Sequence, residues 1–230
     1  MRSPLLFLLF LLTFLGCRLP SHAQDFYFGA TLSPSISHGE LKKDAGTLIL
    51  PSLGIDVLYQ VPETPIFIGS ALSYGQYGTK LTIDHEIIDG VEQSWRIRRN
   101  NNFVTLSGIV RVMPALPGIV RPFIEGQLGG LHTYTRSKVR EDRFSEPYSE
   151  GTEFYDWAEF WQFGAGMVLT PKSWGRLSLE LRMDYLHSAI TEYLTSKDTS
   201  YDSEGAYYFH PRRSPFELLR PGVAVRILLD

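Results

Sequence analysis

The chain has 230 residues, and its 22 Lys and Arg against 25 Asp and Glu give a formal net charge of −3. This length suits one domain or two small ones, and the mildly acidic balance lacks the basic field that nucleic-acid binding needs. Aromatic residues make up 13% of the sequence and there are 20 glycines, a composition that favours β structure in a chain without long helical patterns.

The first 23 residues have the pattern of a secretory signal. Arg2 supplies a positive charge, residues 5–16 are apolar, and a Ser-His-Ala stretch ends at Ala23 with small residues where a signal peptidase cuts. An apolar stretch of about a dozen residues is too short to span a bilayer core of roughly 30 Å as a helix. We expect a cleaved signal peptide at 1–23 and a single mature domain at 24–230.

Lipidation is the alternative fate of this N-terminal segment. Phe14-Leu15-Gly16-Cys17 resembles a lipobox, whose cysteine would carry the lipid and become the first residue. With cleavage after Ala23 the mature chain has no cysteine, because Cys17 is the single one, and therefore no disulfide.

Eight runs of alternating apolar and polar residues follow the signal. Successive side chains of a strand point to opposite faces, so a period of two indicates strands. Most runs have ten or more residues, whereas a usual strand has about five or six and a tilted transmembrane strand roughly 9–11. In chain order the runs are 25–37, 50–61, 66–82, 102–113, 121–136, 156–170, 176–186 and 216–229.

The connections between these runs alternate between long and short. PETP (62–65), PALPGIV (114–120) and PKSWG (171–175) are compact and rich in Pro and Gly, as tight turns require. Outer-membrane barrels have this asymmetry, with short periplasmic turns and longer outer loops. We therefore predict an all-β fold, an eight-stranded antiparallel up-and-down transmembrane β-barrel with both termini in the periplasm. The long polar connections, expected as extracellular loops, lie around 38–47, 83–101, 137–155 and 188–215.

The two faces of the predicted strands differ in chemistry. Rows such as Val223, Val225 and Ile227 are apolar and would face lipid, while the opposite rows carry ionic side chains of nearly balanced sign. An eight-stranded barrel is just wide enough for side chains to fill it, and buried charges must be paired. We predict a lumen charge network of Asp56, Arg111, Glu125, Glu180, Arg182, Asp184 and Arg226.

Three segments resemble the outer-membrane β-barrel families of Bacteroidetes, including PorT-like proteins. They are RPFIEGQLGGLHTYT (121–135), FGAGMVLTP (163–171) and RLSLELRMDYL (176–186). The resemblance implies an outer-membrane barrel, and PorT-like members are linked to a protein-secretion apparatus. The chain departs from such barrels at its end, which reads Leu228-Leu229-Asp230 where they carry a final aromatic residue.

Catalysis has one candidate constellation. An outer-leaflet lipid hydrolase would use His187 and Ser188 with Glu192 as the acid, because a serine nucleophile needs an imidazole oriented by a carboxylate. Adjacent strand residues point to opposite faces, which disfavours a pair between His187 and Ser188. No histidines have the spacing of a metal motif and no cofactor motif is present, so we predict a protein that is not an enzyme and has no metal or cofactor.

The favoured function is a structural or interaction role in the outer membrane of a Gram-negative bacterium, through the extracellular loops and in association with a secretion or surface assembly. Exposed aromatic residues anchor interfaces, so the candidates for binding a protein partner are Tyr201, Tyr207, Tyr208 and Phe209. Outer-membrane lipid and lipopolysaccharide are the other expected partners. Basic points that would face lipopolysaccharide phosphates are Arg96, Arg98, Arg99, Arg212 and Arg213.

A soluble periplasmic lipocalin-like barrel is the third possibility. It would enclose an apolar ligand cavity, and its charged rows would point outward to water. Four long connections argue against this fold.

Overall fold

The structure is a computed structural model that describes residues 26–88, 91–195, 198–201 and 207–229. The predicted signal peptide at 1–23, with its cleavage after Ala23 or lipidation at Cys17, lies outside the described residues. The barrel strands are β1 (Phe26–Ser37), β2 (Ile49–Gln60), β3 (Ile66–Ile88), β4 (Val91–Val112), β5 (Val120–Arg140), β6 (Ser149–Leu169), β7 (Leu177–Tyr193) and β10 (Arg212–Leu229).

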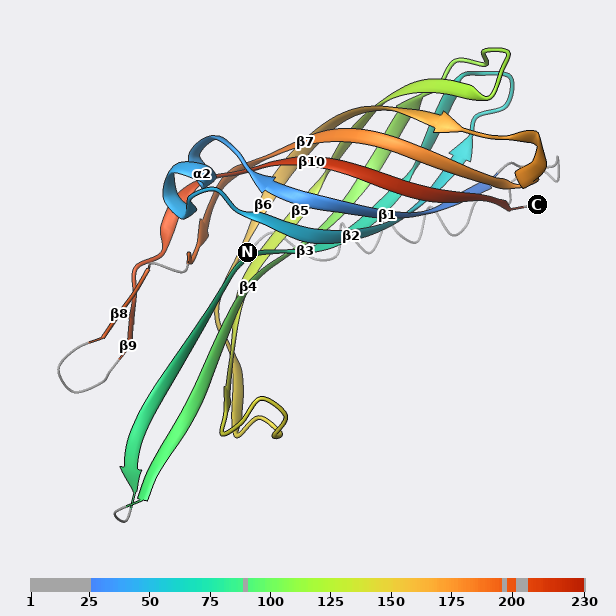
Figure 1. The fold of residues 1–230 in the computed structure, drawn as a ribbon. Helices are drawn as coiled ribbons and strands as arrows, with labels where there is room; N and C mark the ends of the chain where they lie inside the picture. The colour runs from blue at the N-terminus through green and yellow to red at the C-terminus, as the bar shows by residue number, and fades with distance from the viewer. Residues whose placement is uncertain (1–25, 89–90, 196–197, 202–206, 230) are drawn as a thin grey trace, which may run out of the picture.

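These eight strands form the predicted closed antiparallel barrel (Figure 1). Each strand pairs with its neighbours in chain order, and β1 pairs with β10 from Phe26 opposite Leu229 to Ser37 opposite Leu218. Closure leaves no sheet edge within the barrel wall, where the backbone groups of each strand have partners on both sides. We call the end of the barrel that holds both described termini the proximal end and the opposite end the distal end.

The exterior of the barrel is apolar. Val225 is 49% exposed and Leu128 is 72% exposed, whereas Glu180 of β7 has no exposed surface. Aromatic side chains follow the apolar band towards the distal end, where Tyr74 and Trp157 are both exposed. An apolar outer surface around buried ionic side chains is the reverse of a soluble barrel, and the lipocalin-like alternative is therefore wrong.

The interior has three layers. Near the proximal end lies an apolar cluster of Leu58, Phe67, Ile109, Met113, Phe123 and Val168. Buried ionic side chains form the middle layer. Near the distal end lies a second apolar cluster, which contains Leu41, Tyr77, Phe103, Leu131, Phe160, Leu186, Tyr193, Phe216 and Leu218.

A short helix, α2 (Gly39–Ala45), covers the distal mouth, in a segment expected to be a loop. The helix buries Leu41 in the distal apolar cluster, which explains why it forms despite its length, since a two-turn helix is unstable on its own. Gly46 ends it with φ of 86°, a conformation that favours glycine. Among the described residues, no helix is both long and apolar enough to cross a membrane.

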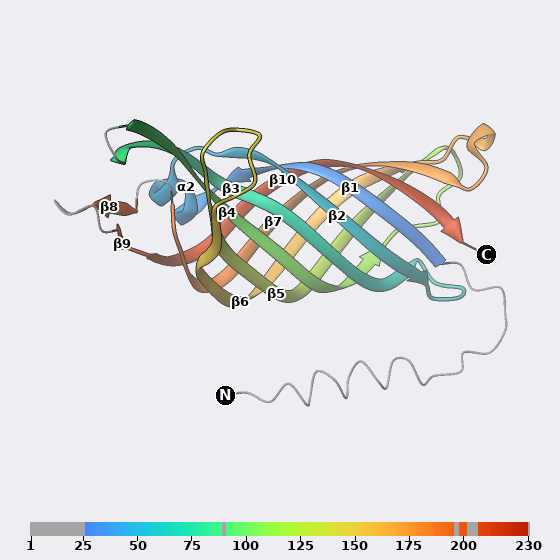
Figure 2. The ribbon, with the colours of Figure 1, turned by 90° about the horizontal axis from the view of Figure 1, so that it is seen from below.

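Two of the expected outer loops are instead paired strands. The ladder of β3 and β4 continues to Ile88 opposite Val91, so most of 83–101 is strand. β5 and β6 likewise pair as far as Val139 opposite Ser149. Cross-strand pairing satisfies the backbone hydrogen bonds of these extensions without a core. Figures 1 and 2 show them leaving the barrel wall as ribbons at the distal end.

Smaller elements complete the chain. A 3-10 turn, η1 (Lys172–Trp174), lies in the compact connection between β6 and β7. The connection between β7 and β10 contains a two-stranded sheet of β8 (Thr199–Tyr201) and β9 (Tyr207–Phe209).

Candidate functional site

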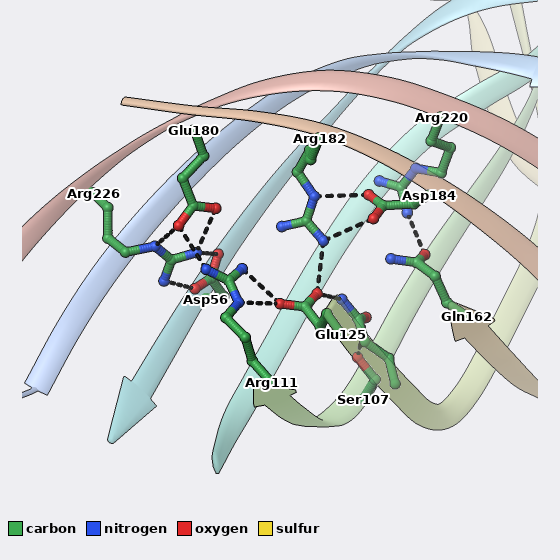
Figure 3. Close-up of polar contacts among 11 residues, drawn as sticks. Asp56, Ser107, Arg111, Glu125, Gln162, Glu180, Arg182, Asp184, Arg220 and Arg226 are labelled. Carbon is green, nitrogen blue, oxygen red and sulfur yellow. Dashed lines mark hydrogen bonds and ion pairs between the residues drawn. The ribbon is translucent and has the colours of Figure 1, made fainter. Parts of the chain in front are cut away.

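A chain of alternating charges crosses the lumen (Figure 3). Its first half joins Asp56 of β2 to Arg111 of β4. The Arg226 guanidinium pairs with Asp56 and also donates from Nε to Glu180 Oε1 at 2.6 Å. Glu180 is shared, because Arg111 Nη1 lies 2.6 Å from the same Oε1 atom. One carboxylate of β7 therefore joins arginines from β4 and β10.

The second half of the chain runs through Glu125 of β5. Arg111 Nε donates to Glu125 Oε2 at 2.7 Å, and Arg182 Nη2 donates to Glu125 Oε1 at 2.6 Å. Arg182 Nε then donates to Asp184 Oδ2 at 2.8 Å. All seven residues predicted for the lumen network lie in this chain, and each is buried. Such pairing is what buried ions require, since an unpaired one is strongly unfavourable.

Arg220 is a lumen cation that the predicted network lacks. It is 4% exposed and donates from Nη1 to Gln162 Oε1 at 3.2 Å. Arg220 lies six residues before Arg226 on β10, and residues an even number apart on a strand share a face. This alternation could have predicted that Arg220 points into the lumen. Pro221 and Gly222 follow it directly and interrupt the alternation. With Arg220, four arginines face four carboxylates in this layer.

The structure does not bring the catalytic candidates together. His187 lies on the outer face with Nδ1 3.2 Å from Glu217 Oε1, whereas Ser188 is fully buried on the inner face. Ser188 Oγ donates to the Ala189 carbonyl and accepts from the Phe216 amide at 2.8 Å. The two side chains lie on opposite faces because they are adjacent on a strand, as the sequence predicts.

The third member of the hydrolase hypothesis, Glu192, is held elsewhere. Its backbone N–H donates to Asp156 Oδ2 at 2.7 Å. His187, Ser188 and Glu192 are all described residues, and they do not form the geometry of a catalytic triad. Within the part of the chain that the structure describes, no group of His, Cys, Asp and Glu is arranged to hold a metal ion.

Helix α2 is tied to the barrel wall by polar contacts at both ends. The Glu217 carboxylate accepts from the Glu40 amide at 2.7 Å and from the Tyr185 hydroxyl at 2.8 Å. At the other end, Tyr193 Oη donates to Asp44 Oδ2 at 2.8 Å. With Leu41 buried between these contacts, the helix closes the distal mouth of the lumen.

The aromatic candidates for partner binding lie on the small sheet. Tyr201 of β8 pairs with Tyr207 of β9, and Tyr208 is next to them. The side chains of these three tyrosines lie outside the described residues. Phe209 is partly buried, and its ring lies under the Arg99 guanidinium, 4.9 Å from the ring centroid.

A basic groove lies on the projecting ribbons. It has a volume of about 470 Å³, and five of its lining residues are cations while one is an acid. The residues that define this basic groove are Thr79, Leu81, Arg96, Arg98, Asn100, Lys138, Arg140, Asp142 and Arg143. Two of the cations, Arg96 and Arg98, were predicted as basic points for phosphate.

Cations face each other across the strands of this groove. Arg98 lies directly opposite Lys138, and Arg96 lies directly opposite Arg140, in the ladder of β4 and β5. Like charges in such positions destabilise a sheet. Lys138 Nζ has a partner in Glu150, 2.9 Å away, and Arg98 Nε donates to Asn100 Oδ1 at 3.3 Å. The groove therefore retains a positive excess that an anion would relieve.

The fold is similar to that of solved outer-membrane barrels. Neisserial surface protein A matches with a TM-score of 0.53 and 10% identity, covering 90% of this chain and 100% of that chain. A major outer membrane protein from Thermus thermophilus has a TM-score of 0.46 and 13% identity, covering 90% and 100%. Ail, the attachment invasion locus protein of Yersinia pestis, solved with the heparin analogue sucrose octasulfate, has a TM-score of 0.39 and 11% identity, covering 89% and 97%. No family model and no curated protein matches the sequence.

The closed sheet, the exposed apolar band and the sealed ionic lumen together are the features of a transmembrane β-barrel. Neisserial surface protein A shares this fold. The protein is therefore a β-barrel of the outer membrane.

Proposed function

We propose that this barrel is a non-enzymatic anchor that holds two β-ribbons and a basic groove at the cell surface, with both termini in the periplasm. The observation that carries the proposal is the continuation of β3, β4, β5 and β6 past the aromatic level as paired strands. The groove on these ribbons is lined by five cations and one acid, and this strongly basic surface suits contact with an acidic partner in water.

The lumen supports an anchoring role over a transport role. Buried side chains fill three layers, with Leu58 in the proximal, Arg111 in the middle and Phe103 in the distal layer, and helix α2 covers the distal mouth. Eight strands leave space for little more than side chains. We expect the purified protein to give no stepwise conductance in planar bilayers, and steady channels would contradict a sealed lumen.

Trimming one ribbon tests the interaction role. Thr79 lies opposite Asn100, so residues 80–99 can be replaced by Asn-Gly, a dipeptide that forms a two-residue hairpin turn. We expect the trimmed barrel to fold, to fractionate with the outer membrane and to lose cross-linking from the ribbon to surface partners. A trimmed protein that keeps the same cross-linked partners would contradict the proposal.

Protease added to intact cells tests the orientation. Trypsin should cut the ribbons, which carry Lys138 and Arg140 beyond the barrel, and should leave the barrel fragment in the membrane. Cleavage only after the outer membrane is opened would place the ribbons in the periplasm.

A secretion or surface assembly is the partner class that the resemblance to PorT-like proteins supports. The small sheet with Tyr201, Tyr207, Tyr208 and Phe209 is the surface that we propose for it. Replacing these aromatic residues together with serine should remove such a partner from protein purified out of native membranes in mild detergent, and its retention would contradict this assignment.

A further inference from the structure

We propose that the basic groove binds the phosphate groups of a phosphorylated glycolipid in the same outer leaflet that holds the barrel. This inference rests on the proposed surface orientation and names the ligand of the groove.

The face of the sheet that carries the groove is continuous with the face that contacts lipid. In the unbroken ladder of β4 and β5, Leu106 lies opposite Gly130 and Asn102 lies opposite Tyr134. Arg98 opposite Lys138 continues the same row, because side chains two residues apart share a face. A single lipid bound on this face can therefore contact the apolar surface, the aromatic level and the cations, because all three lie on the same side of the sheet.

The height of the groove suits a phosphate on a sugar head group. Lys138 is four residues, or roughly 13 Å of strand, beyond Tyr134 at the aromatic level. Figure 1 shows the ribbon leaving the barrel obliquely, so the height above the aromatic level is less than this length. Aromatic girdles lie at the membrane interface, and groups just beyond them meet the polar part of the leaflet.

The groove also carries exposed aliphatic side chains beside its cations. Leu81 lies opposite Arg98 and is 50% exposed, and Ile83 lies opposite Arg96 and is 48% exposed. These aliphatic side chains lie at the same level as the cations, beyond the aromatic residues, where a sugar head group with apolar ring faces and phosphates would contact them.

Charge geometry supplies the attraction. The facing pairs of Arg98 with Lys138 and Arg96 with Arg140 place cations from two strands around one space. Guanidinium groups bind phosphate oxygens with paired, charge-assisted hydrogen bonds, and an ammonium adds a point charge. Phosphate bound between them would replace cross-strand repulsion with attraction to both strands.

The test compares binding of a diphosphorylated and a dephosphorylated glycolipid. The full chain is refolded in detergent micelles containing either form, and bound lipid is counted by native mass spectrometry. The double variant Arg98→Gln with Lys138→Gln removes one facing pair. The control Lys42→Gln with Lys43→Gln removes the same charge from helix α2 at the same end of the barrel, where both lysines are exposed.

We expect the wild type and the control to prefer the diphosphorylated form at least tenfold and the double variant to lose that preference. Heat-modifiable gel mobility will show that each variant is folded, and relief of like charges should leave the double variant no less stable without lipid. Equal binding of both lipid forms to the wild type, or an equal loss in the control, would overturn the inference.

Two further measurements are needed. The first distinguishes a membrane glycolipid from a soluble polyanion as the ligand, and the second distinguishes failure of the glycolipid inference from failure of the proposed interaction role. A sulfated disaccharide that binds the wild type as tightly as the glycolipid, and fails to bind the double variant, would assign the groove to a soluble polyanion and overturn the lipid assignment. Ribbon cross-links that persist without any phosphate preference would leave the surface role standing and remove only this ligand. A phosphate preference in a protein whose ribbon gives no cross-linked partner would support the glycolipid as ligand and contradict the proposed interaction role of the ribbon.

Discussion

The Glu180 carboxylate lies 2.6 Å from Arg111 on one side and 2.6 Å from Arg226 on the other, with no exposed surface. Glu180→Gln would leave two buried guanidinium groups facing each other without the charge between them. Removing one partner of a buried ion pair costs about 3–5 kcal/mol, and we expect the free energy of unfolding to fall by that amount.

Urea titration of the refolded barrel in lipid vesicles measures this change. Leu181→Ile is the matched control, because Leu181 is the next residue on β7 and faces lipid, where an isomer of equal volume changes little. Equal midpoints for the two variants would show that the lumen chain does not hold the barrel together.

Helix α2 should be held in place by Leu41. Leu41→Ala removes a side chain that is fully buried in the distal apolar cluster, a change that costs about 2–5 kcal/mol in a packed core. We expect the helix to detach locally and trypsin to cut faster after Lys42 and Lys43. Thr47→Ala, at an exposed site beyond the helix, should leave the cleavage rate unchanged, and similar rates for both variants would contradict the anchoring role of Leu41.

The barrel itself was predictable because alternation reports which residues share a face. Leu181 with Met183, and Arg182 with Asp184, fall on opposite parities in the sequence, and the structure has the first pair exposed and the second buried. The alternation of apolar and polar residues does not reveal where a strand ends once the strand has left the membrane, because both of its faces then contact water. The residues after Thr82 were therefore expected as loop, although they continue as strand to Ile88.

The basic groove was predictable only in part. Arg96 and Arg98 were visible as basic points, but their opposition to Arg140 and Lys138 depends on the register of β4 and β5 beyond the barrel. Register is set by pairing over the whole strand, which no local pattern contains. Helix α2 was missed for a similar reason, since it forms by burying Leu41 against residues distant in the sequence.

Ser188 should be a structural residue rather than a nucleophile. Ser188→Ala removes the acceptor of the buried Phe216 amide, 2.8 Å away, and an unsatisfied buried donor costs about 1–3 kcal/mol. We expect lower stability in urea and no change in lipid deacylation assayed with radiolabelled phospholipid. Deacylation by the wild type that disappears in both Ser188→Ala and His187→Gln would contradict the non-enzymatic role.

Glu150 should weaken anion binding in the groove. Its carboxylate lies 2.9 Å from Lys138 Nζ and also pairs with Arg136. The hydrogen bond from Lys138, with that from Arg136, holds the pKa of Glu150 below its usual range, so the carboxylate is ionised at neutral pH and offsets part of the positive charge. Glu150→Gln should therefore bind the diphosphorylated glycolipid severalfold more tightly at low salt.

This gain should shrink as salt rises, because exposed charges are screened beyond a Debye length of about 10 Å at 0.1 M. The control Glu153→Gln removes an exposed acid from the same strand outside the groove. The stabilising pairs of Glu150 are present at neutral pH and are lost as the pH falls through its lowered pKa, so the wild type should approach the variant only in acid. Equal affinities for Glu150→Gln and Glu153→Gln at neutral pH and low salt would show that Glu150 does not act on the groove.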